Sequence, residues 1–287
     1  MKLNDERSEA HGGEPTVTER VGDGLVRIPL VTPTLPPATR TNSYLARGAT
    51  GWTLVDLGPA GVDAVHAALD AADAHADGRD RVHALLLTHH HPDHVGGLDA
   101  WRAATRRPVV AHAHTWDRIA ADPDDHDVVV RGDDTWDGLA LWHTPGHAPG
   151  HLAVETGAGW IVGDLMAGTG TIVVDPSDGS MHDYLASLER FAGCDVPGWP
   201  SHGPVLPDVG ARSAAYVAHR LRREARVVAA LAPEPRDLMA VTARAYEDVP
   251  AALHGFASRS ALAHLEKLET DGLAARDGGA KWLLVSG

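Results

Sequence analysis

The segment from His89 to His94 holds the side chains of this sequence that are best suited to chemistry. Together with Thr88 it spells Thr-His-His-His-Pro-Asp-His, which sets His89, His91, Asp93 and His94 in a His-x-His-x-Asp-His pattern. Imidazole nitrogens and carboxylate oxygens at this density are ligands for zinc or iron. Because Asp93 and His94 are adjacent and leave a turn in different directions, the pattern favours two metal ions over one.

Three later segments offer side chains of the same kind. A Thr-Pro-Gly-His turn presents His147, a short apolar run ends at Asp164, and a Ser-His-Gly-Pro loop presents His202. A carboxylate such as Asp164 can bridge two cations. Each segment alone is a weak signal. Four of them in order, each after an expected strand or in a loop rich in Gly and Pro, predict one binuclear metal site.

The apolar pattern of the chain predicts the elements that must position these side chains. Short apolar runs bounded by Gly or Pro predict strands, and apolar residues at three- and four-residue spacing predict helices. The expected strands are 25–31, 42–47, 51–58, 82–88, 108–113, 139–143 and 160–162, and the expected helices are 62–76, 98–105, 181–191 and 207–231. The strand 82–88 ends where the histidines begin, so the transition to a loop can direct alternate side chains into one pocket.

Beyond Pro235 the pattern changes. Helices are expected at 237–246 and 258–270, followed by two short strands at 273–276 and 281–285, which is the order of a winged-helix unit. A unit of this kind that binds DNA is basic, yet residues 236–287 carry six basic and seven acidic side chains. We therefore expect this region to pack against the rest of the chain or to form a wall of a substrate site.

Composition excludes several classes of protein. The chain has 287 residues with 25 Lys and Arg against 39 Asp and Glu, a formal net charge of −14, and the resulting field repels nucleic acid and anionic membranes. Cys194 is the single cysteine, so an intramolecular disulfide framework is excluded. The polar segment 1–16 is expected to be disordered. A soluble cytoplasmic enzyme without a membrane segment, acting on a small molecule, is the simplest expectation.

From about residue 25 to 231 the chain resembles the metallo-β-lactamase-fold hydrolases, on the four segments described above. The resemblance implies an α/β protein with a four-layer αββα sandwich over residues 17–232 and a small winged-helix-like module over residues 233–287. It also implies the ligands of the metals. His89, His91 and His147 match the first metal site, Asp93, His94 and His202 match the second, and Asp164 bridges both.

The C-terminal region narrows the resemblance. The sequence Ser-His-Gly-Pro-Val from position 201, the pairs His219-Arg220 and Arg223-Glu224, and the winged-helix-like end are similar to the β-lactamase-like protein two branch. Members of that branch include an endoribonuclease. The true di-zinc β-lactamases carry Cys or His where this chain has Asp164, so lactam hydrolysis is disfavoured.

The resemblance implies a hydrolase with two divalent metal ions, zinc foremost, with iron and manganese as alternatives. A hydroxide that bridges the metals would attack an ester, thioester, lactone or similar acyl bond. Asp93 is the expected catalytic residue, because it can orient the water and assist the leaving group. The alternatives are an endoribonuclease or phosphodiesterase of the same fold, a mononuclear iron dioxygenase acting on a persulfide, and a winged-helix regulator with a relict metal site.

Other histidines have simpler explanations. His90 lies between two expected ligands and should point away from them, because side chains alternate along an extended chain. His151 is expected to support a ligand rather than to bind metal itself. His112 and His114 are two apart at the end of an expected strand, and with no matching carboxylate after them they are expected to be ordinary strand-end residues.

Overall fold

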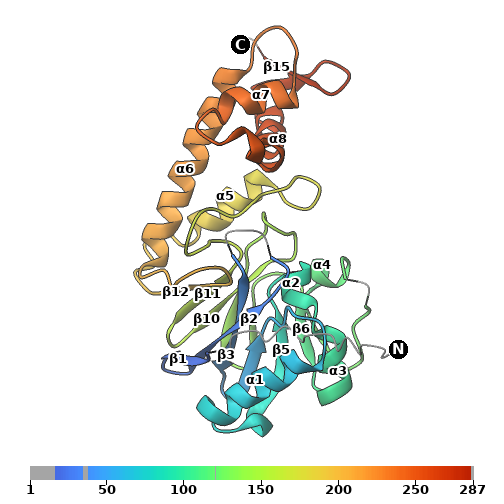
Figure 1. The fold of residues 1–287 in the computed structure, drawn as a ribbon, viewed down its shortest axis with the longest axis vertical. Helices are drawn as coiled ribbons and strands as arrows, with labels where there is room; N and C mark the ends of the chain where they lie inside the picture. The colour runs from blue at the N-terminus through green and yellow to red at the C-terminus, as the bar shows by residue number, and fades with distance from the viewer. Residues whose placement is uncertain (1–16, 35–37, 120, 286–287) are drawn as a thin grey trace, which may run out of the picture.

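The computed structural model describes residues 17–34, 38–119 and 121–285. The segment 1–16, expected to be disordered, lies outside the described residues. The body of the molecule contains two sheets that face each other, and a smaller C-terminal part stands beside them at the end of one long helix (Figure 1). The α/β sandwich and the C-terminal winged-helix unit expected from the sequence are confirmed.

The first sheet has seven strands in chain order. The pairs from β1 to β4 are antiparallel and those from β4 to β7 are parallel. The strands are β1 (Glu19–Gly22), β2 (Leu25–Val31), β3 (Arg40–Arg47), β4 (Trp52–Val55), β5 (Val82–Leu87), β6 (Val109–His112) and β7 (Val128–Val130). Helices α1 (Val62–His75) and α3 (Leu98–Thr105) supply the crossovers that parallel strands require.

The second sheet has five strands in the order β12-β11-β10-β9-β8. They are β8 (Asp134–Trp136), β9 (Leu139–His143), β10 (Leu152–Thr156), β11 (Gly159–Gly163) and β12 (Gly198–Pro200). Only the pair of β11 and β12 is parallel in this sheet, and the connection between these strands contains α5 (Met181–Glu189). The carboxyl ends of β11 and β12 therefore lie at the same edge.

Three apolar layers hold the sandwich together. Strand β5 shows how the sequence forms two of them, because Leu85 and Leu87 pack under α1 and α3 while Ala84 and Leu86 pack between the sheets. This alternation is the two-residue period of a strand that is buried on both faces. The third layer lies between the second sheet and helices α5 and α6 (Val209–Ala230), where Phe191 packs with Trp142 and Trp160.

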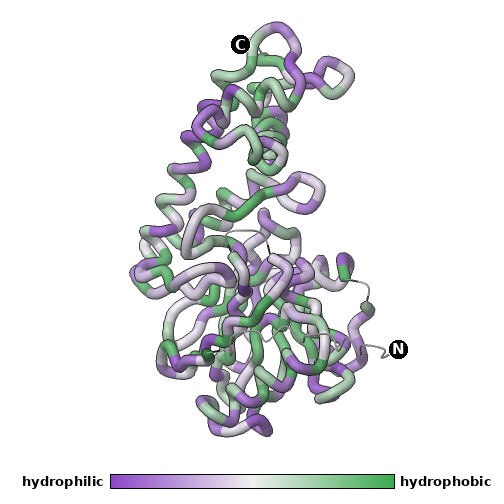
Figure 2. Tube along the Cα trace, viewed as in Figure 1, coloured by the Kyte–Doolittle hydropathy of each residue, from purple (hydrophilic) through white to green (hydrophobic). Residues whose placement is uncertain are grey.

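Helix α6 connects the sandwich to the C-terminal module. Its colours in Figure 2 change between hydrophilic and hydrophobic from turn to turn, as expected of an amphipathic helix. The module has its own core, which includes Val227 of α6 and Trp282. Its elements are β13 (Arg236–Asp237), α7 (Leu238–Ala245), a short 3₁₀ turn (Ala251–Leu253), α8 (His254–Thr270), β14 (Ala274–Arg276) and β15 (Lys281–Leu284).

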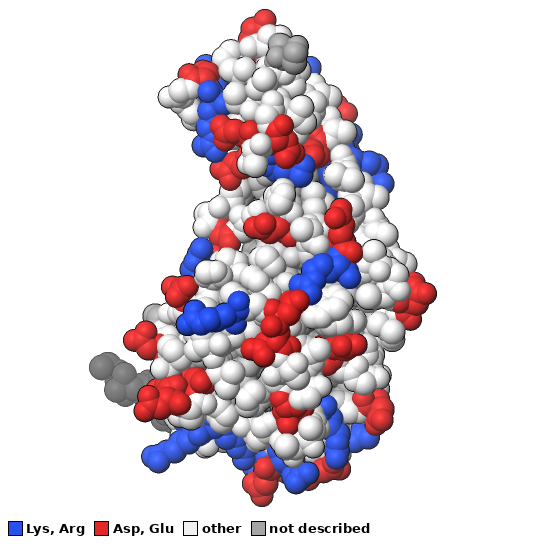
Figure 3. Space-filling view, turned by 180° about the vertical axis from the view of Figure 1, so that it is seen from behind, with Lys and Arg blue, Asp and Glu red and all other residues white. Residues whose placement is uncertain are grey.

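Two further features of the structure concern the charge on its surface and the length of its helices. On the face shown in Figure 3, acidic and basic side chains are interspersed over both parts of the molecule. None of the helices within the described part of the chain is long and apolar enough to cross a membrane.

Candidate metal centre

All four segments singled out in the sequence meet at one edge of the two sheets. Strand β5 ends at Leu87, and the loop after it leads into the short helix α2 (Pro92–Val95), which has His91 as its N-terminal cap residue. Proline at the first position of a helix fits because its missing N–H is not needed there. The backbone N–H of Leu152 donates to the carbonyl of Thr88 (2.8 Å), which joins the second sheet to the histidine loop.

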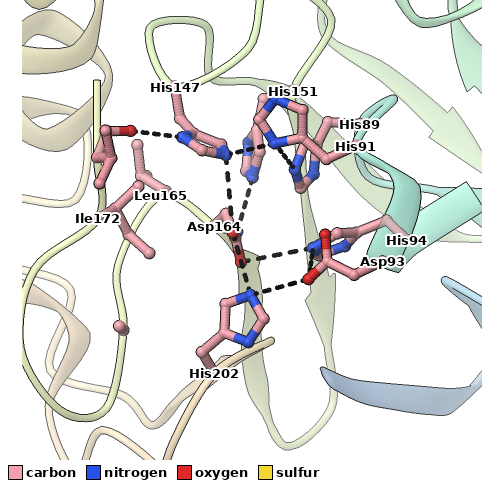
Figure 4. A network of polar contacts seen from close by, with 12 residues as sticks. His89, His91, Asp93, His94, His147, His151, Asp164, Leu165, Ile172 and His202 are labelled. Carbon is pink, nitrogen blue, oxygen red and sulfur yellow. Dashed lines mark hydrogen bonds and ion pairs between the residues drawn. The ribbon is translucent and has the colours of Figure 1, made fainter. Parts of the chain in front are cut away.

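Three imidazoles form the first group. His91 Nδ1 lies 3.0 Å from His89 Nε2 and 3.0 Å from His147 Nε2 (Figure 4). His89 is fully buried and His147 is nearly so. Three nitrogens from two separate loops thus face one another around a single point.

The outer nitrogens of these rings decide where the protons lie. His147 Nδ1 lies 2.9 Å from the carbonyl oxygen of Val173, and His91 Nε2 lies 2.8 Å from Asp178 Oδ2, so each of these nitrogens must carry a proton to donate. His89 Nδ1 lies 3.0 Å from the Thr88 hydroxyl, which already donates its own proton to Asp56. All three inner nitrogens therefore present lone pairs to one another, an arrangement that a cation between them stabilises.

The second group contains Asp93, His94 and His202. His202 Nε2 lies 3.3 Å from Asp93 Oδ2, and His94 Nε2 lies 3.6 Å from the same oxygen. The outer nitrogen of His94 donates to Asp56 Oδ2 (2.8 Å). Among the residues that the structure describes, the buried His94 Nε2 has no hydrogen-bond partner, and this orphaned nitrogen fits a metal ligand.

Asp164 lies between the two groups. Its Oδ2 is 3.6 Å from His147 Nε2 and 3.3 Å from His202 Nε2, while its Oδ1 is 3.7 Å from His94 Nε2. Oδ1 is buried without a hydrogen-bond partner in the described part of the chain. One carboxylate thus faces imidazoles of both groups, as a bridging ligand must.

The electrostatics of the two groups differ. Burial, followed by the neighbouring imidazoles, holds the pKa of His89 well below its usual value, and burial lowers the pKa of His147 to about 4. Burial also lowers the pKa of His94, but Asp56 and Asp164 outweigh it and raise that pKa to about 9. His89 and His147 are therefore neutral at pH 7, whereas His94 holds a proton that a metal would have to displace.

The carboxylates of the second group are ionised. Burial raises the pKa of Asp93, but the hydrogen bond with His202 and the charge of His94 outweigh it and lower that pKa to about 2. In return, Asp164 and Asp93 overcome the burial of His202 and raise its pKa to about 11. The site is thus built to hold positive charge between its carboxylates.

His151 lies behind this site. Its Nε2 accepts a hydrogen bond from the backbone N–H of Asp164 (3.1 Å), and its Nδ1 donates to the Thr144 hydroxyl (2.8 Å). Both nitrogens are used, so this buried side chain supports the strand end that carries Asp164, the kind of role expected for it.

The other histidines lie outside both groups. His90 Nε2 donates to Asp178 Oδ2 (3.1 Å) and its side chain is mostly buried, so it faces Asp178 and not solvent. His112 stacks on the ring of His143, with the ring centroids 4.0 Å apart, and His114 is exposed beside Asp117.

Two residues of the site were not found from the sequence. Asp56 accepts hydrogen bonds from the Thr88 N–H (2.7 Å), the Thr88 hydroxyl and His94, and it is buried directly after β4. The position of Asp56 directly after the apolar strand β4 was the signal in the sequence that could have revealed it. Asp178 lies in an Asp-Gly turn, which reads as an ordinary loop.

A four-layer sandwich with this set of imidazoles and carboxylates at one sheet edge defines a metal-dependent hydrolase. Residues 36–197 match the model of the Metallo-beta-lactamase superfamily, and residues 238–282 match that of the Beta-lactamase associated winged helix domain. The chain belongs to the metallo-beta-lactamase superfamily.

Individual relatives agree with this assignment. The Beta-lactamase-like protein 2 homolog of Caenorhabditis elegans is 28% identical over 267 residues, 89% of this chain and 87% of that protein, which supports the expected branch. The Atrochrysone carboxyl ACP thioesterase of Aspergillus chevalieri is 31% identical over 197 residues, 67% of this chain and 60% of that protein. The structure of a Beta-lactamase domain protein from Burkholderia ambifaria matches with a TM-score of 0.76 and 23% identity, covering 93% of each chain.

Proposed function

We propose that this chain is a binuclear hydrolase of activated acyl bonds, with a thioester as the leading substrate class and an ester or lactone as the alternatives. His89, His91 and His147 would hold one ion, Asp93, His94 and His202 would hold the other, and Asp164 would bridge them. The observation that carries this proposal is the convergence of imidazole nitrogens and carboxylate oxygens from four separate segments. The imidazole-rich donor set suits zinc, and iron or manganese would also be accepted.

Two bound divalent cations would lower the pKa of a water between them and polarise the scissile carbonyl. The residues of the chain contribute orientation and charge. The Thr41 hydroxyl donates to Asp93 Oδ2 (3.0 Å) and holds this carboxylate at the site. Because Asp93 is ionised at neutral pH, it can accept a hydrogen bond from the attacking water and so orient it.

The same low pKa makes Asp93 a weak proton donor to a leaving group. Thiols have a pKa near 8.5, so a thiolate departs with little protonation, whereas an amine or alkoxide needs a stronger acid. This difference favours a thioester over a lactam or a phosphodiester. It agrees with the thioesterase name of one relative, and the net charge of −14 opposes an RNA substrate.

A substrate screen with metal-loaded protein tests the proposal. Thioester, lactone, phosphodiester and lactam substrates are compared for wild type, for Asp164→Ala and for His114→Ala, whose exposed imidazole lies outside both groups. We expect thioesterase activity that falls by at least about a thousandfold in Asp164→Ala and is unchanged in His114→Ala. Activity that survives Asp164→Ala would not come from this site, and exclusive phosphodiesterase activity would favour the nuclease alternative.

Metal analysis tests the binuclear part separately. Two zinc ions per chain are expected, whereas a single iron would favour the dioxygenase alternative. The division into a catalytic domain of residues 17–232 and a module of residues 233–287 belongs to the same proposal, as does a cytoplasmic location. Limited proteolysis tests the division, and cell fractionation tests the location.

A further inference from the structure

The segment 172–178 lies between β11 and α5, has no regular secondary structure, and runs beside the first group of imidazoles. Two of the three rings in that group find the partner of their outer nitrogen in this one segment. The carbonyl of Val173 accepts from His147 Nδ1 (2.9 Å), and Asp178 Oδ2 accepts from His91 Nε2 (2.8 Å). The segment therefore decides which nitrogen of each ring faces inward.

The two contacts are not equivalent. A backbone carbonyl can be supplied by any residue, so the contact of Val173 depends only on the path of the chain. The contact of Asp178 depends on its side chain, which also accepts from His90 Nε2 (3.1 Å) and from Arg118, a residue in the turn after the short helix α4 (Ala113–Trp116). Three donors fix this carboxylate, and a fixed carboxylate holds the ring of His91 in one orientation.

His91 is the ring that most needs such support. It lies in the loop immediately before α2, its side chain is about 29% exposed, and it presents Nδ1 inward, whereas the more buried His89 and His147 present Nε2. A rotation of the ring by 180° would turn Nδ1 away from the other two nitrogens. The hydrogen bond to Asp178 opposes this rotation, because only the observed orientation brings Nε2 to the carboxylate.

The segment itself is held by the C-terminal half of the chain. The buried Arg220 of α6 donates to the carbonyl of Ile172, and its guanidinium lies over the ring of Tyr184. Arg259 of α8 lies 3.5 Å from Asp175 Oδ2. A chain of contacts thus joins the C-terminal module to the outer partners of two expected metal ligands.

We propose that Asp178 is a positioning residue that orients His91 for the first metal ion, within a segment that α6 and α8 hold in place. The inference rests on the proposed metal binding. It assigns to a loop carboxylate a role in setting the affinity of one of the two metal positions.

The test is a metal titration of Asp178→Asn, with Asp175→Asn as the matched control. Both changes replace one carboxylate of the same segment by an isosteric amide. Asp175 accepts from Ser177 and lies beside Arg259, but in the described part of the chain it makes no hydrogen bond or ion pair with a ring of the first group. Zinc affinity is measured by competition with a chromophoric chelator, and cobalt substitution reports the ligand geometry by absorption spectroscopy. Thermal unfolding of the metal-free proteins shows whether each variant is folded.

We expect Asp178→Asn to weaken one zinc-binding step by about 10- to 100-fold and to change the cobalt spectrum of that step, while the other step and the control stay close to wild type. The kcat of Asp178→Asn should be close to that of wild type at saturating zinc and well below it at limiting zinc. Equal affinities in Asp178→Asn and wild type would overturn the inference, as would an equal loss in Asp175→Asn, which would mean a general loosening of the segment.

Two further outcomes separate this inference from the proposed function. His90, His91 and Asp178 also form a group that could hold an ion by themselves. If wild type binds a third zinc that Asp178→Asn loses, then Asp178 is a ligand and not a positioning residue. If wild type binds no pair of zinc ions at all, the proposed function fails first. If it binds the pair and Asp178→Asn binds it equally well, only the present inference fails.

Discussion

At the scale of single residues, the site depends on which nitrogen of each ring carries the proton. Asp56 illustrates this, because it accepts from His94 Nδ1 (2.8 Å) and from the Thr88 hydroxyl, which in turn faces His89. The buried carboxylate of Asp56 thereby orients His94 of the second group directly and His89 of the first group through Thr88. Asp56 adopts a left-handed backbone (φ 61°), which Asp tolerates better than most residues because its short side chain bonds locally.

The two groups should differ in how pH affects metal uptake. His94 and His202 have pKa values of about 9 and about 11 in the metal-free protein, so at pH 7.5 both hold a proton that a metal must displace. Burial lowers the pKa of His147 to about 4 and holds that of His89 well below its usual value, so these two rings of the first group would bind a metal without losing a proton. We expect one zinc-binding step whose affinity rises about tenfold per pH unit for each proton lost, and one that changes little between pH 7 and 8.5.

Calorimetric titration in buffers of different ionisation enthalpy counts the protons released in each zinc-binding step.

The same protonation has the opposite effect on the stability of the metal-free protein, which falls as the pH rises. Because the pKa of His94 is raised on folding, its pairing with Asp56 stabilises the fold fully below pH 6.5 and is lost as the pH rises through about 9. If both zinc ions bind with the same pH dependence, the assignment of protons to the second group is wrong.

At the scale of elements, the sequence predicts the strands that are buried on both faces and the long amphipathic helices. The runs at 51–58 and 82–88 correspond to β4 and β5, and the helix expected at 207–231 is α6, within two residues at each end. Strands β1 and β10 and the three-residue strands β7, β8 and β12 were missed, because runs so short have no clear period of their own and depend on pairing with neighbours.

The ends of the elements were harder to predict than the elements themselves. Helix α8 begins at His254 and not at residue 258, because the 3₁₀ turn after Pro250 leads directly into it. The segment 172–178 gave no signal, since its role comes from carbonyl and carboxylate positions that only the folded chain defines. The four segments that carry the expected ligands come together at one sheet edge, and their His and Asp spacing was itself the signal that singled them out.

The end of β11 offers a test of how an element positions a ligand. Gly163 has a left-handed backbone (φ 51°), and a Cβ added there would lie 2.5 Å from His151 Nε2, the atom that accepts from the Asp164 N–H. Gly163→Ala should therefore displace His151 and Asp164 together, at a cost of about 1–2 kcal/mol in backbone strain alone. We expect activity and zinc affinity to fall by at least about tenfold, measured by steady-state kinetics and chelator competition.

Gly157→Ala is the matched control for this change. It lies in the turn between β10 and β11, and its nearest contact would be an ordinary 3.6 Å from the carbonyl of Asp23. Both variants remove a glycine near β11, but only Gly163→Ala should affect the metal site. Wild-type zinc affinity in a folded Gly163→Ala protein would show that this close packing does not position Asp164.

At the scale of the whole molecule, the expected metal ligands connect parts of the chain that are far apart in sequence. The first sheet supplies the histidine loop after β5, and the second supplies His147, Asp164 and His202 from three separate strand ends. Bound ions would therefore join the two sheets at one edge. The C-terminal module, which has a core of its own, is joined to this edge through α6, through α8 and through the segment 172–178.

Metal removal should accordingly lower the stability of the sandwich. A ligand at a hundred times its dissociation constant stabilises the folded state by about 2.7 kcal/mol, and for a chain of this size 1 kcal/mol shifts Tm by about 2–4 °C. We expect EDTA to lower the Tm of the zinc-loaded protein by about 5–10 °C, measured by differential scanning calorimetry, and zinc to restore it. The double variant His89→Ala, His94→Ala removes one ring from each group and provides the control, because EDTA should barely change its Tm. An equal shift in this variant would mean that EDTA acts elsewhere, and no shift in the zinc-loaded wild type would mean that the ions do not join the two sheets.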